Sequence, residues 1–504
     1  MSRFRIIPAI ETRPDLVRFA QTCPGKTCLL LGFALALALH RKSYFIETTA
    51  ILAVMTFFPR HRRPLLLTGT MLWLITQTPL GIHHINAIAT QGRYHFLPGQ
   101  YTLRTISICI TIIFCAALTA LAKAEKTNWF NRRPVVWLHI IFFCLLAVCT
   151  YMPPISGAWK IFLCGITIVL SRYFWFLGYT LLDCRSKNSV PFIWQLGSYL
   201  PFWNGRFPTS VPFPKGSSYL NKIEAKDSYS LAIVQLKGIK LIYWSLILLL
   251  IRGLFNGLVY GDPICRSGYS LPFGILIPGF SLPLHLSVPH YEDVITKYLS
   301  GRPLPLYQSW LSLAANFMSS LLDLSIWGHI IISTCRMAGF AALRNTYRPL
   351  ESRSIAEFWN RYYYYFKEML VSFFFYPTFF RFFKKYPNIR MFTATVAAAG
   401  LGNAIYHFIF HTSHVIQYGF WQAIVDFQGY IFYCLVLSTA IGISQIRNRH
   451  RDKKTYTGLW KTNKFISSFS VTGFYCILSI FGGLKHPLPL HDSIGFLLSL
   501  FGIS

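Results

Sequence analysis

The sequence predicts an all-α polytopic membrane protein, and three observations support this prediction. Of the 504 residues, 53% are hydrophobic and only 13% are charged, which is too apolar for a soluble chain of this length. The apolar residues gather in runs long enough to form membrane-spanning helices. The net charge is +31, and lysine and arginine cluster in short loops between those runs. We therefore expect a single integral-membrane domain over residues 1–504, with about ten or eleven crossings plus re-entrant or interfacial helices.

The basic charge indicates contact with anionic membrane lipids and excludes nucleic acid as a partner, because it lies in short loops and does not line one face. The twelve cysteines include no C-x-x-C pair and lie mostly inside apolar runs, so they are expected to be small buried hydrophobes. The first apolar run, Cys28–Leu39, follows a mixed-charge head and precedes His40 and Arg41. We interpret it as a short membrane or re-entrant helix and not as a cleavable signal peptide.

The N-terminal part, residues 1–182, alternates apolar runs with basic and uncharged loops. Basic residues within 60–63 and 123–133 mark cytoplasmic loops, whereas the loop His83–Gln100 is poor in lysine and arginine and is expected outside. This alternation predicts a cytoplasmic N-terminus. After the first run, the predicted crossings are Tyr44–Phe58, Pro64–Ile82, Leu103–Ala122, Pro134–Met152 and Trp159–Leu182.

The next segment, residues 183–238, is predicted to be cytoplasmic and is rich in proline and aromatic residues. Proline at this density excludes a regular helix, and aromatic side chains such as Trp203 and Phe213 argue against a free linker. We therefore expect an ordered interfacial loop. Two interpretations stay open: the aromatic residues belong to the mouth of a binding site, or they form an aromatic belt at the membrane interface.

Residues 239–504 are expected to form the core of the protein. Residues 261–290 are too broken by proline to span and too apolar for a solvated loop, which favours a re-entrant or surface-lying hairpin. The stretch Phe373–Phe383 has cytoplasmic flanks on both sides, so it should dip into the membrane or lie flat. The predicted crossings are Ile239–Leu258, Ser309–Cys335, Met391–Phe410, Phe420–Ile443 and Phe465–Phe481, and Ser493–Ile503 returns or lies in the interface.

Two of these runs contain a carboxylate, Asp323 in one and Asp426 in the other. An ionisable group within a span is costly in lipid, so both side chains should face the protein interior. Each is interpreted either as a structural contact with a neighbouring helix or as part of a functional site, and for Asp426 the functional alternative is to orient a histidine.

The most polar stretch of the core half, Asn345–Lys367, is predicted to lie on the cytoplasmic side. Ser352 or Ser354 is an expected helix N-cap, and Glu357 follows Ser354 at the spacing of a capping box. Glu357 and Arg361 can share one side of this helix, and aromatic residues surround it. Such a helix suits the membrane interface, and its simplest interpretation is an amphipathic anchor.

The same stretch also resembles a known family. The match consists of Asn345, Pro349, Leu350, Ser354, Glu357, Phe358, Trp359 and Arg361, followed by Tyr376-Pro377. This pattern is similar to the signature of the membrane-bound O-acyltransferase family, in which bacterial members have an Asn-x-Pro-Tyr-Leu-like turn before a Ser-x-x-Glu-Phe-Trp-x-Arg-Trp-His helix. The Gly400-Leu401 pair would match the opening of the family's Gly-Leu-Trp-His-Gly motif.

The resemblance implies transfer of an acyl group from a cytoplasmic thioester to a hydroxyl group of a lipid, a glycan or an exported acceptor. The donor would be acyl-coenzyme A or an acyl-carrier protein, with no tightly bound cofactor or metal. Its partners would be membrane lipids and, in some systems, a carrier or partner protein. The expected location is the bacterial cytoplasmic (inner) membrane.

The chain departs from the family where the histidines would stand. Tyr362-Tyr363 replaces the Trp-His pair, and Gly402-Asn403 occupies the register of the catalytic histidine. His407 follows one helical turn later, so it and Asn403 share a helix face. At about 1.5 Å per residue from Met391, His407 lies about 24 Å into a hydrocarbon core about 30 Å thick. That depth suits an acceptor that arrives from the far side.

These residues suggest a division of roles. Neutral histidine is the side chain best suited to remove a hydroxyl proton, so His407 is the candidate base, and Asn403 would orient the acyl group or the histidine. The candidate residues for donor binding are Glu357, Trp359, Arg361, Asn345 and Tyr363, and the candidates for a supporting shell are Asp323, His411 and Asp426.

Four alternatives stay open. His407, His411 and His414 could form a polar seam between helices, or could hold a metal or haem, although no carboxylate or cysteine shares their spacing. The chain could be a non-catalytic relative or partner subunit, which Asn403 favours. It could also be a transporter or flippase of lipid-linked glycans.

Overall fold

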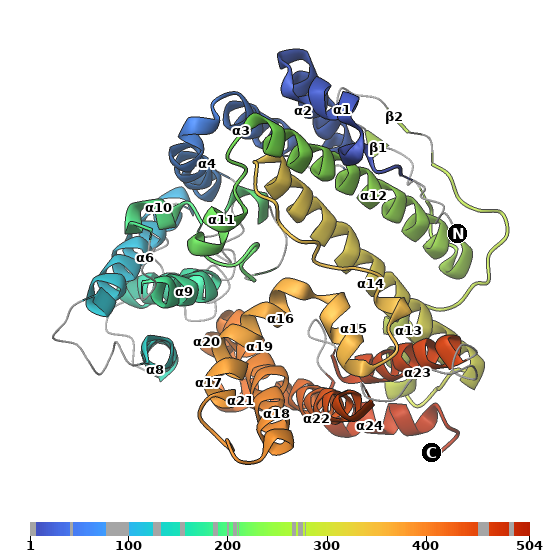
Figure 1. Cartoon of the computed structure of the whole chain (residues 1–504). Coiled ribbons are helices and arrows are strands. Elements are labelled where there is room, and N and C mark those ends of the chain that lie inside the picture. The colour runs from blue at the N-terminus through green and yellow to red at the C-terminus, as the bar shows by residue number, and fades with distance from the viewer. Residues whose placement is uncertain are drawn as a thin grey trace.

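The chain folds almost entirely into helices (Figure 1). The structure is a computed structural model and describes residues 7–40, 44–76, 100–123, 133–151, 157–184, 190–198, 201–204, 209, 211–264, 269–270, 276–277, 279–451, 463–482 and 488–503. A single main cluster of buried apolar side chains extends from Leu30 to Leu500. The N-terminal and C-terminal parts therefore share one hydrophobic core.

Six helices within these ranges are long and apolar enough to cross a membrane, and a seventh span results if the pair α1 (Pro14–Gln21) and α2 (Cys23–Leu39), bent by 96°, is counted as one. The all-α polytopic class is thereby confirmed. The predicted total of about ten or eleven crossings includes helices shorter than these six, and it stays a prediction. The six are α8 (Pro134–Tyr151), α9 (Gly157–Asp183), α12 (Ser228–Tyr260), α14 (Leu306–Met337), α22 (Gln428–Arg451) and Phe465–Gly482, which includes most of α23 (Asn463–Leu478).

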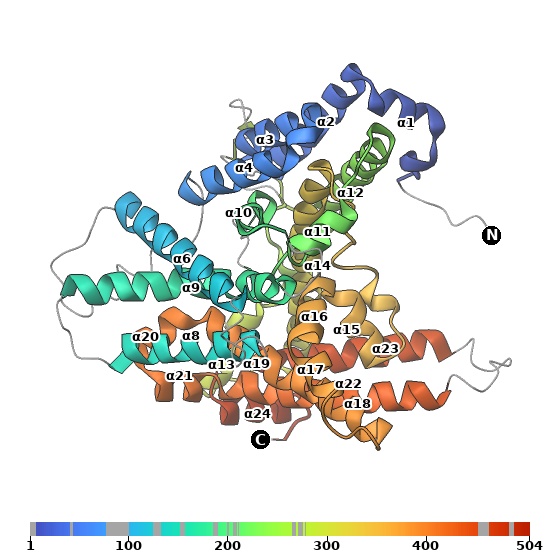
Figure 2. The same ribbon diagram turned by 60° about the vertical axis from the view of Figure 1, so that its left-hand side comes forward.

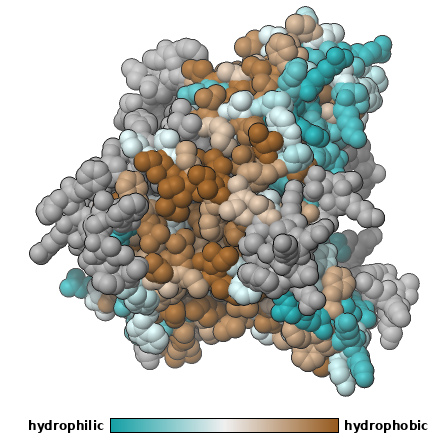
Figure 3. Space-filling view, turned by 90° about the vertical axis from the view of Figure 1, so that its left-hand side faces the viewer, coloured by the Kyte–Doolittle hydropathy of each residue, from teal (hydrophilic) through white to brown (hydrophobic). Residues whose placement is uncertain are grey.

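The exterior of these helices is apolar, as a membrane protein requires. Figure 3 shows apolar residues gathered across the middle of one face, with hydrophilic residues toward its margins. Large apolar side chains are exposed on several helices, among them Leu31, Leu35, Ile46, Val136, Ile140 and Leu254. A surface of this kind is stable against hydrocarbon and not against water.

The N-terminal helices lie close to their predicted positions. They are α3 (Phe45–Phe57), α4 (Arg62–Thr76) and α6 (Gln100–Lys123). In Figure 2, α6, α8 and α9 form one group, and α2, α3 and α4 another above it. The predicted external loop His83–Gln100 lies outside the described residues apart from Gln100.

Helices α12 and α14 pack side by side and form the most extensive contact between any two of the described elements (Figure 1). Helix α12 begins at Ser228 because Asp227 caps it, accepting a hydrogen bond of 2.8 Å from the amide of Ser230. Residues 228–238, predicted to belong to the proline-rich segment, are therefore the first turns of this helix. The helix ends at Tyr260, and Gly261 caps it with a positive φ of 79°, which is favourable for glycine.

The proline-rich segment is ordered, as predicted, wherever it is described. It contains α10 (Phe192–Leu196), a short turn at Phe202–Asn204 and α11 (Ser217–Ile223). The rings of Trp203 and Phe213 are almost fully buried, and the Trp203 indole donates a hydrogen bond of 2.6 Å to the carbonyl of Phe213. These rings pack inside the protein, which is contrary to an aromatic belt facing lipid headgroups.

Arg62 holds residues Glu224 and Ala225 of the proline-rich segment in place. The charge pattern predicted a cytoplasmic basic loop at this position, and the structure buries one of its arginines: only 2% of Arg62 is exposed. Its guanidinium donates to Glu224 at 3.1 Å and to the carbonyl of Ala225 at 2.8 Å. The basic residues at 60–63 therefore include one that holds the fold together and is not available to lipid headgroups.

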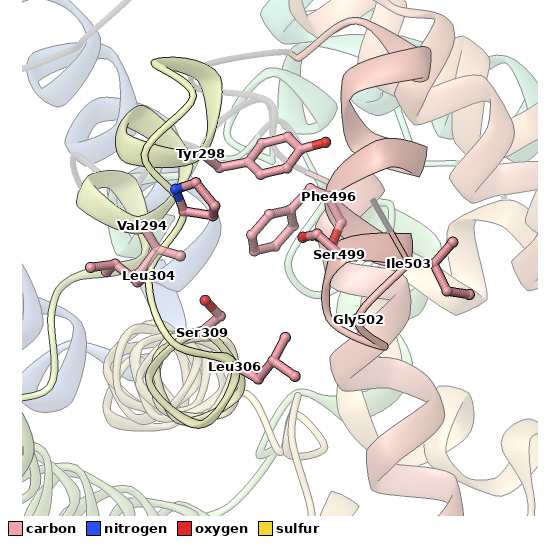
Figure 4. Close-up of a pocket in the computed structure, with 10 residues that line it drawn as sticks. Val294, Tyr298, Leu304, Leu306, Ser309, Phe496, Ser499, Gly502 and Ile503 are labelled. Carbon is pink, nitrogen blue, oxygen red and sulfur yellow. The ribbon is translucent and has the colours of Figure 1, made fainter.

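Residues 261–290 contain the predicted hairpin. Strand β1 (Tyr269–Ser270) pairs antiparallel with β2 (Leu276–Ile277), and the chain that follows is exposed on the surface. Helix α13 (Tyr291–Leu299) then leads into α14. Together with α24 (Leu490–Ser499) these helices form a partly open, mostly apolar pocket of about 190 Å³, which is lined by Leu304, Leu306 and Phe496 among others (Figure 4). None of the predicted site residues lines this pocket.

The stretch predicted to carry function is a series of short helices. They are α15 (Ile355–Tyr362), α16 (Tyr364–Leu370), α17 (Tyr376–Phe379), α18 (Pro387–Thr395), α19 (Asn403–Phe410), α20 (Thr412–Tyr418) and α21 (Phe420–Asp426). Residues Val371–Phe375 and Val396–Gly402 are π-helical. The predicted span Met391–Phe410 therefore consists of α18, a π-helical stretch and α19.

Candidate functional site

Helix α15 begins where the sequence predicted. The hydroxyl of Ser354 accepts a hydrogen bond of 3.2 Å from the amide of Glu357, which is the first half of a capping box. The second half is displaced by one residue, because the Glu357 carboxylate accepts a hydrogen bond of 2.8 Å from the amide of Arg353. The N-cap is therefore Ser354 and not Ser352, only the first half of the capping box is formed, and Glu357 is held at the start of the helix.

Glu357 and Arg361 form an ion pair of 2.6 Å on the half-buried side of α15. Arg361 also donates a hydrogen bond of 3.3 Å to the carbonyl of Arg348. The pair thus links α15 to the turn at Pro349–Glu351. Both charged groups keep about a third of their side-chain surface exposed, so a ligand can reach them.

Asn345 lies behind this helix and is 1% exposed. Its side-chain oxygen accepts a hydrogen bond of 3.3 Å from the amide of Tyr365, and its carbonyl accepts one of 2.9 Å from the amide of Tyr364. The Nδ2 atom is buried with no hydrogen-bond partner in the described chain. Asn345 therefore ties the turn to α16 and retains one unused donor.

Two aromatic residues of the predicted donor set extend this packing. The Tyr363 hydroxyl lies 3.1 Å from the hydroxyl of Thr209, in the proline-rich segment, and its ring stacks on Phe213 at 6.1 Å. The Trp359 ring contacts Phe366 at 6.0 Å. The proline-rich segment thus packs against the C-terminal end of α15, which is compatible with the interpretation of that segment as part of a binding mouth.

An ion triad of Glu368, Lys215 and Lys367 lies between the proline-rich segment and α16. Glu368 lies 2.6 Å from the ammonium group of Lys215 and 2.6 Å from that of Lys367. Burial raises the pKa of Glu368, but the hydrogen bonds from the two lysines outweigh this effect and lower the pKa below its ordinary value. The carboxylate therefore stays ionised and joins α16 to the proline-rich segment.

The second half of the stretch brings Asn403 and His407 against α22. Tyr430 of α22 donates a hydrogen bond of 3.1 Å to the side-chain oxygen of Asn403, and its ring lies 4.6 Å from that of His407. The two predicted catalytic residues therefore share a face, as their spacing indicated. The Nδ1 atom of His407 is buried, and no group of the described chain forms a hydrogen bond with it.

Phe366 connects the two halves of the stretch. Its ring lies 6.0 Å from Trp359 of α15, 5.9 Å from His407 and 4.8 Å from Tyr406. Helix α16 therefore places α15 and His407 side by side. Nothing in the sequence spacing identified Phe366 as this link.

The glycines of the second half serve close helix packing. A Cβ atom on Gly402 would lie 2.5 Å from the ring of Phe374, and one on Gly400 would lie 2.9 Å from the hydroxyl of Ser438. Leu401 points outward and is 59% exposed. Of the Gly400-Leu401 pair, which resembles the opening of a catalytic motif, only Gly400 thus has a packing role in this fold.

The supporting residues are divided among three places. Asp426 pairs with His414 at 2.9 Å and Asp323 with Arg252 of α12 at 2.9 Å, so neither of these contacts involves His407. Asp323 is also 46% exposed, contrary to the expected interior position. His411 lies at the break between α19 and α20, where its ring contacts Phe427 at 6.3 Å.

This break also bears on metal ligation. Helix α19 ends at Phe410, so His407, His411 and His414 do not lie on one continuous helix. Within the described ranges, no group of three histidine, cysteine, aspartate or glutamate side chains is arranged to hold a metal ion. His414 instead pairs with Asp426, as a polar contact between helices.

No protein-family model matches the sequence, and no curated protein matches it. The resemblance of residues 345–414 to the membrane-bound O-acyltransferases therefore remains a prediction. The geometry of the site must support any function proposed for it.

Proposed function

We propose that the protein is a membrane-bound acyltransferase that moves an acyl group from a cytoplasmic thioester to a hydroxyl group of a lipid, a glycan or an exported acceptor. The observation that supports this most strongly is the surroundings of His407. Its Nδ1 is buried without a partner in the described chain, although polar groups buried in protein are normally hydrogen-bonded. An acceptor hydroxyl is the kind of group that such a nitrogen would receive.

The reaction requires two functions, and this cluster offers both. His407 takes the proton as the acceptor oxygen attacks the thioester carbonyl. The carbon–sulfur bond then breaks, and the imidazolium returns the proton to the departing thiolate. Tyr430 holds the oxygen of the Asn403 amide at 3.1 Å, which directs the amide nitrogen away from Tyr430 and leaves it to stabilise the tetrahedral oxyanion.

The donor would enter from the surface formed by α15, α16 and the proline-rich segment. Arg361 and Glu357 are reachable there, and the rings of Trp359 and Phe366 lead from them toward His407. A thioester with an anionic head group and an apolar chain matches this order of cationic and aromatic groups. Acyl-coenzyme A and acyl-carrier protein both have that character.

We place the protein in the bacterial cytoplasmic membrane with its N-terminus inside. This placement rests on the positive charge of the predicted loops. It puts the Glu357–Arg361 pair on the cytoplasmic side, where thioesters are made. It also lets an acceptor approach His407 from the opposite side.

A radiolabelled acyl-coenzyme A assay tests the proposal. Purified protein in vesicles made from total envelope lipid should transfer label to an acceptor, and the His407→Ala protein should not. Transfer at an unchanged rate in the His407→Ala protein would overturn the role of His407. No transfer by the wild-type protein, together with export of a glycan, would instead favour a transporter.

The non-catalytic alternative has one specific observation in its favour, namely Asn403 at the position of the family's histidine. A non-catalytic partner subunit should show no transfer alone and should copurify with an active acyltransferase. A tagged wild-type protein purified from its native membrane therefore separates the two cases.

A further inference from the structure

Arg172 lies in the middle of α9, one of the six candidate membrane spans, and has no acidic partner in the described chain. Its guanidinium carbon lies 4.1 Å from the centre of the Phe410 ring, and its Nε is buried without a hydrogen-bond partner. An unpaired cation within a span is costly and is normally retained for a function. The cation–π contact with Phe410 offsets only part of that cost.

Arg252 is a second arginine within a candidate span, and it differs from Arg172 in having an acidic partner. It also lies inside a candidate span, α12, but its guanidinium is 2.9 Å from the Asp323 carboxylate. Arg252, whose role is structural, is therefore neutralised by a carboxylate of a neighbouring helix. Arg172 lacks such a partner in the described chain, and the residue as a whole is only half-buried, so an external anion can supply the missing charge.

The position of Arg172 relates it to His407. Phe410, on which the guanidinium rests, lies three residues after His407 on α19. One turn further along α9, the ring of Trp175 lies 5.7 Å from that of Tyr406, the residue before His407. Helices α9 and α19 are thus in register at this depth, and the cation and the candidate base are separated by about one helical turn, about 5 Å along the axis.

We propose that Arg172 binds an anionic group of the acceptor, namely a phosphate ester that lies a few bonds from the hydroxyl to be acylated. This inference rests on the proposed function, because it assigns the acceptor that reaches His407. The planar guanidinium suits a phosphate, which it can bind through two parallel hydrogen bonds. A glycerol phosphate unit has the required distance between hydroxyl and phosphate, either as a lipid headgroup or as a soluble molecule.

Thermal unfolding of the purified full-length protein in neutral detergent tests the proposal. The probes are phosphatidylglycerol, phosphatidylcholine with the same acyl chains, and soluble glycerol 3-phosphate. Phosphatidylglycerol or glycerol 3-phosphate should raise the unfolding temperature of the wild-type protein, and phosphatidylcholine should raise it less. A response to only one of the two glycerol phosphates identifies the lipid or the soluble source.

Variants show whether Arg172 is the site. Arg172→Gln should fold, because no ion pair within the described chain is lost, and should weaken binding of the responsive probe about tenfold or more. Arg172→Lys should retain part of the shift and serves if Arg172→Gln does not fold. The matched control is Arg252→Gln with Asp323→Asn, which removes an intramembrane arginine together with its partner and should keep the shift.

Two results would overturn the proposal. One is an equal shift with phosphatidylglycerol and phosphatidylcholine, without any response to glycerol 3-phosphate. The other is a shift that persists in Arg172→Gln. Acyl transfer in His407→Ala and anion binding in Arg172→Gln are read from separate assays, so failure of the proposed function and failure of the Arg172 site give different results.

Discussion

Tyr430 donates a hydrogen bond of 3.1 Å to Asn403, and its ring lies 4.6 Å from that of His407. Two residues spaced by one helical turn are thereby held by a single residue of another helix. The bond fixes the orientation of the Asn403 amide, and the ring covers one side of the imidazole. Rigid placement of this kind is what a general base requires.

Replacing His407 with alanine should lower acyl transfer by about 10²-fold to 10⁴-fold, which is the range for loss of a general base. Thermal unfolding and detergent gel filtration should show a folded protein. The matched control is His414→Ala, since His414 pairs with Asp426 at 2.9 Å and serves as a structural contact between helices. An equal loss in both variants would contradict the specific role of His407.

Removing the Tyr430 hydroxyl should lower the rate of transfer by about tenfold, which corresponds to the loss of one oriented hydrogen bond. Because Tyr430 acts through Asn403, the effects of Tyr430→Phe and Asn403→Ala should not add in the double variant. Tyr433→Phe, in which the neighbouring ring is changed, is the control. Additive effects in a steady-state assay would show that the two residues act separately.

The ion triad at Glu368 predicts a pH dependence of stability. The pKa of Glu368 is lowered by Lys215 and Lys367, so the stabilisation is full above the ordinary glutamate pKa of about 4.3 and is lost as the pH falls below it. Glu368→Gln should therefore unfold at a lower temperature than the wild-type protein at neutral pH. The difference should shrink in acid.

Thermal unfolding between neutral pH and about pH 3.5, below the ordinary glutamate pKa, measures this change. Glu292→Gln, at an exposed position of α13, serves as the control and should show little difference at any pH. A constant difference between Glu368→Gln and the wild-type protein at every pH would mean that packing, and not charge, stabilises the triad.

Alanine at Gly402 should destabilise the protein by about 1–3 kcal/mol, which is typical of overpacking. The added Cβ would lie 2.5 Å from the Phe374 ring, so a helix or the ring must move. Gly473 of α23 has nothing within 4 Å of the same atom, and Gly473→Ala should be neutral or stabilising by up to about 1 kcal/mol. Equal unfolding temperatures for the two variants would contradict the close packing.

Much of the fold could be predicted from hydrophobic runs. The bounds of α8 and α14 lie within a few residues of the predicted spans, because a long apolar run flanked by polar residues has few alternatives in a membrane. The N-cap at Ser354 and the shared face of Asn403 and His407 also followed from local spacing. Local rules determine these features.

The rest depends on contacts between segments distant in sequence. The partners Tyr430 and Phe366 could not be identified, since nothing in a single sequence shows which rings will meet. The π-helical stretch before Asn403 was also missed, because glycine and alanine there are equally compatible with a regular helix. Arg172 did carry a signal, a cation within an apolar run, and could have been singled out as Asp323 was.

The central claim is that His407 makes this protein an acyltransferase. The most direct measurement is mass spectrometry of envelope lipids and glycans from cells that produce either the wild-type protein or its His407→Ala variant at equal membrane levels. We expect a species with an added acyl mass in wild-type cells and its absence in the variant. The same acylated species in both cells, or in neither, would contradict the claim.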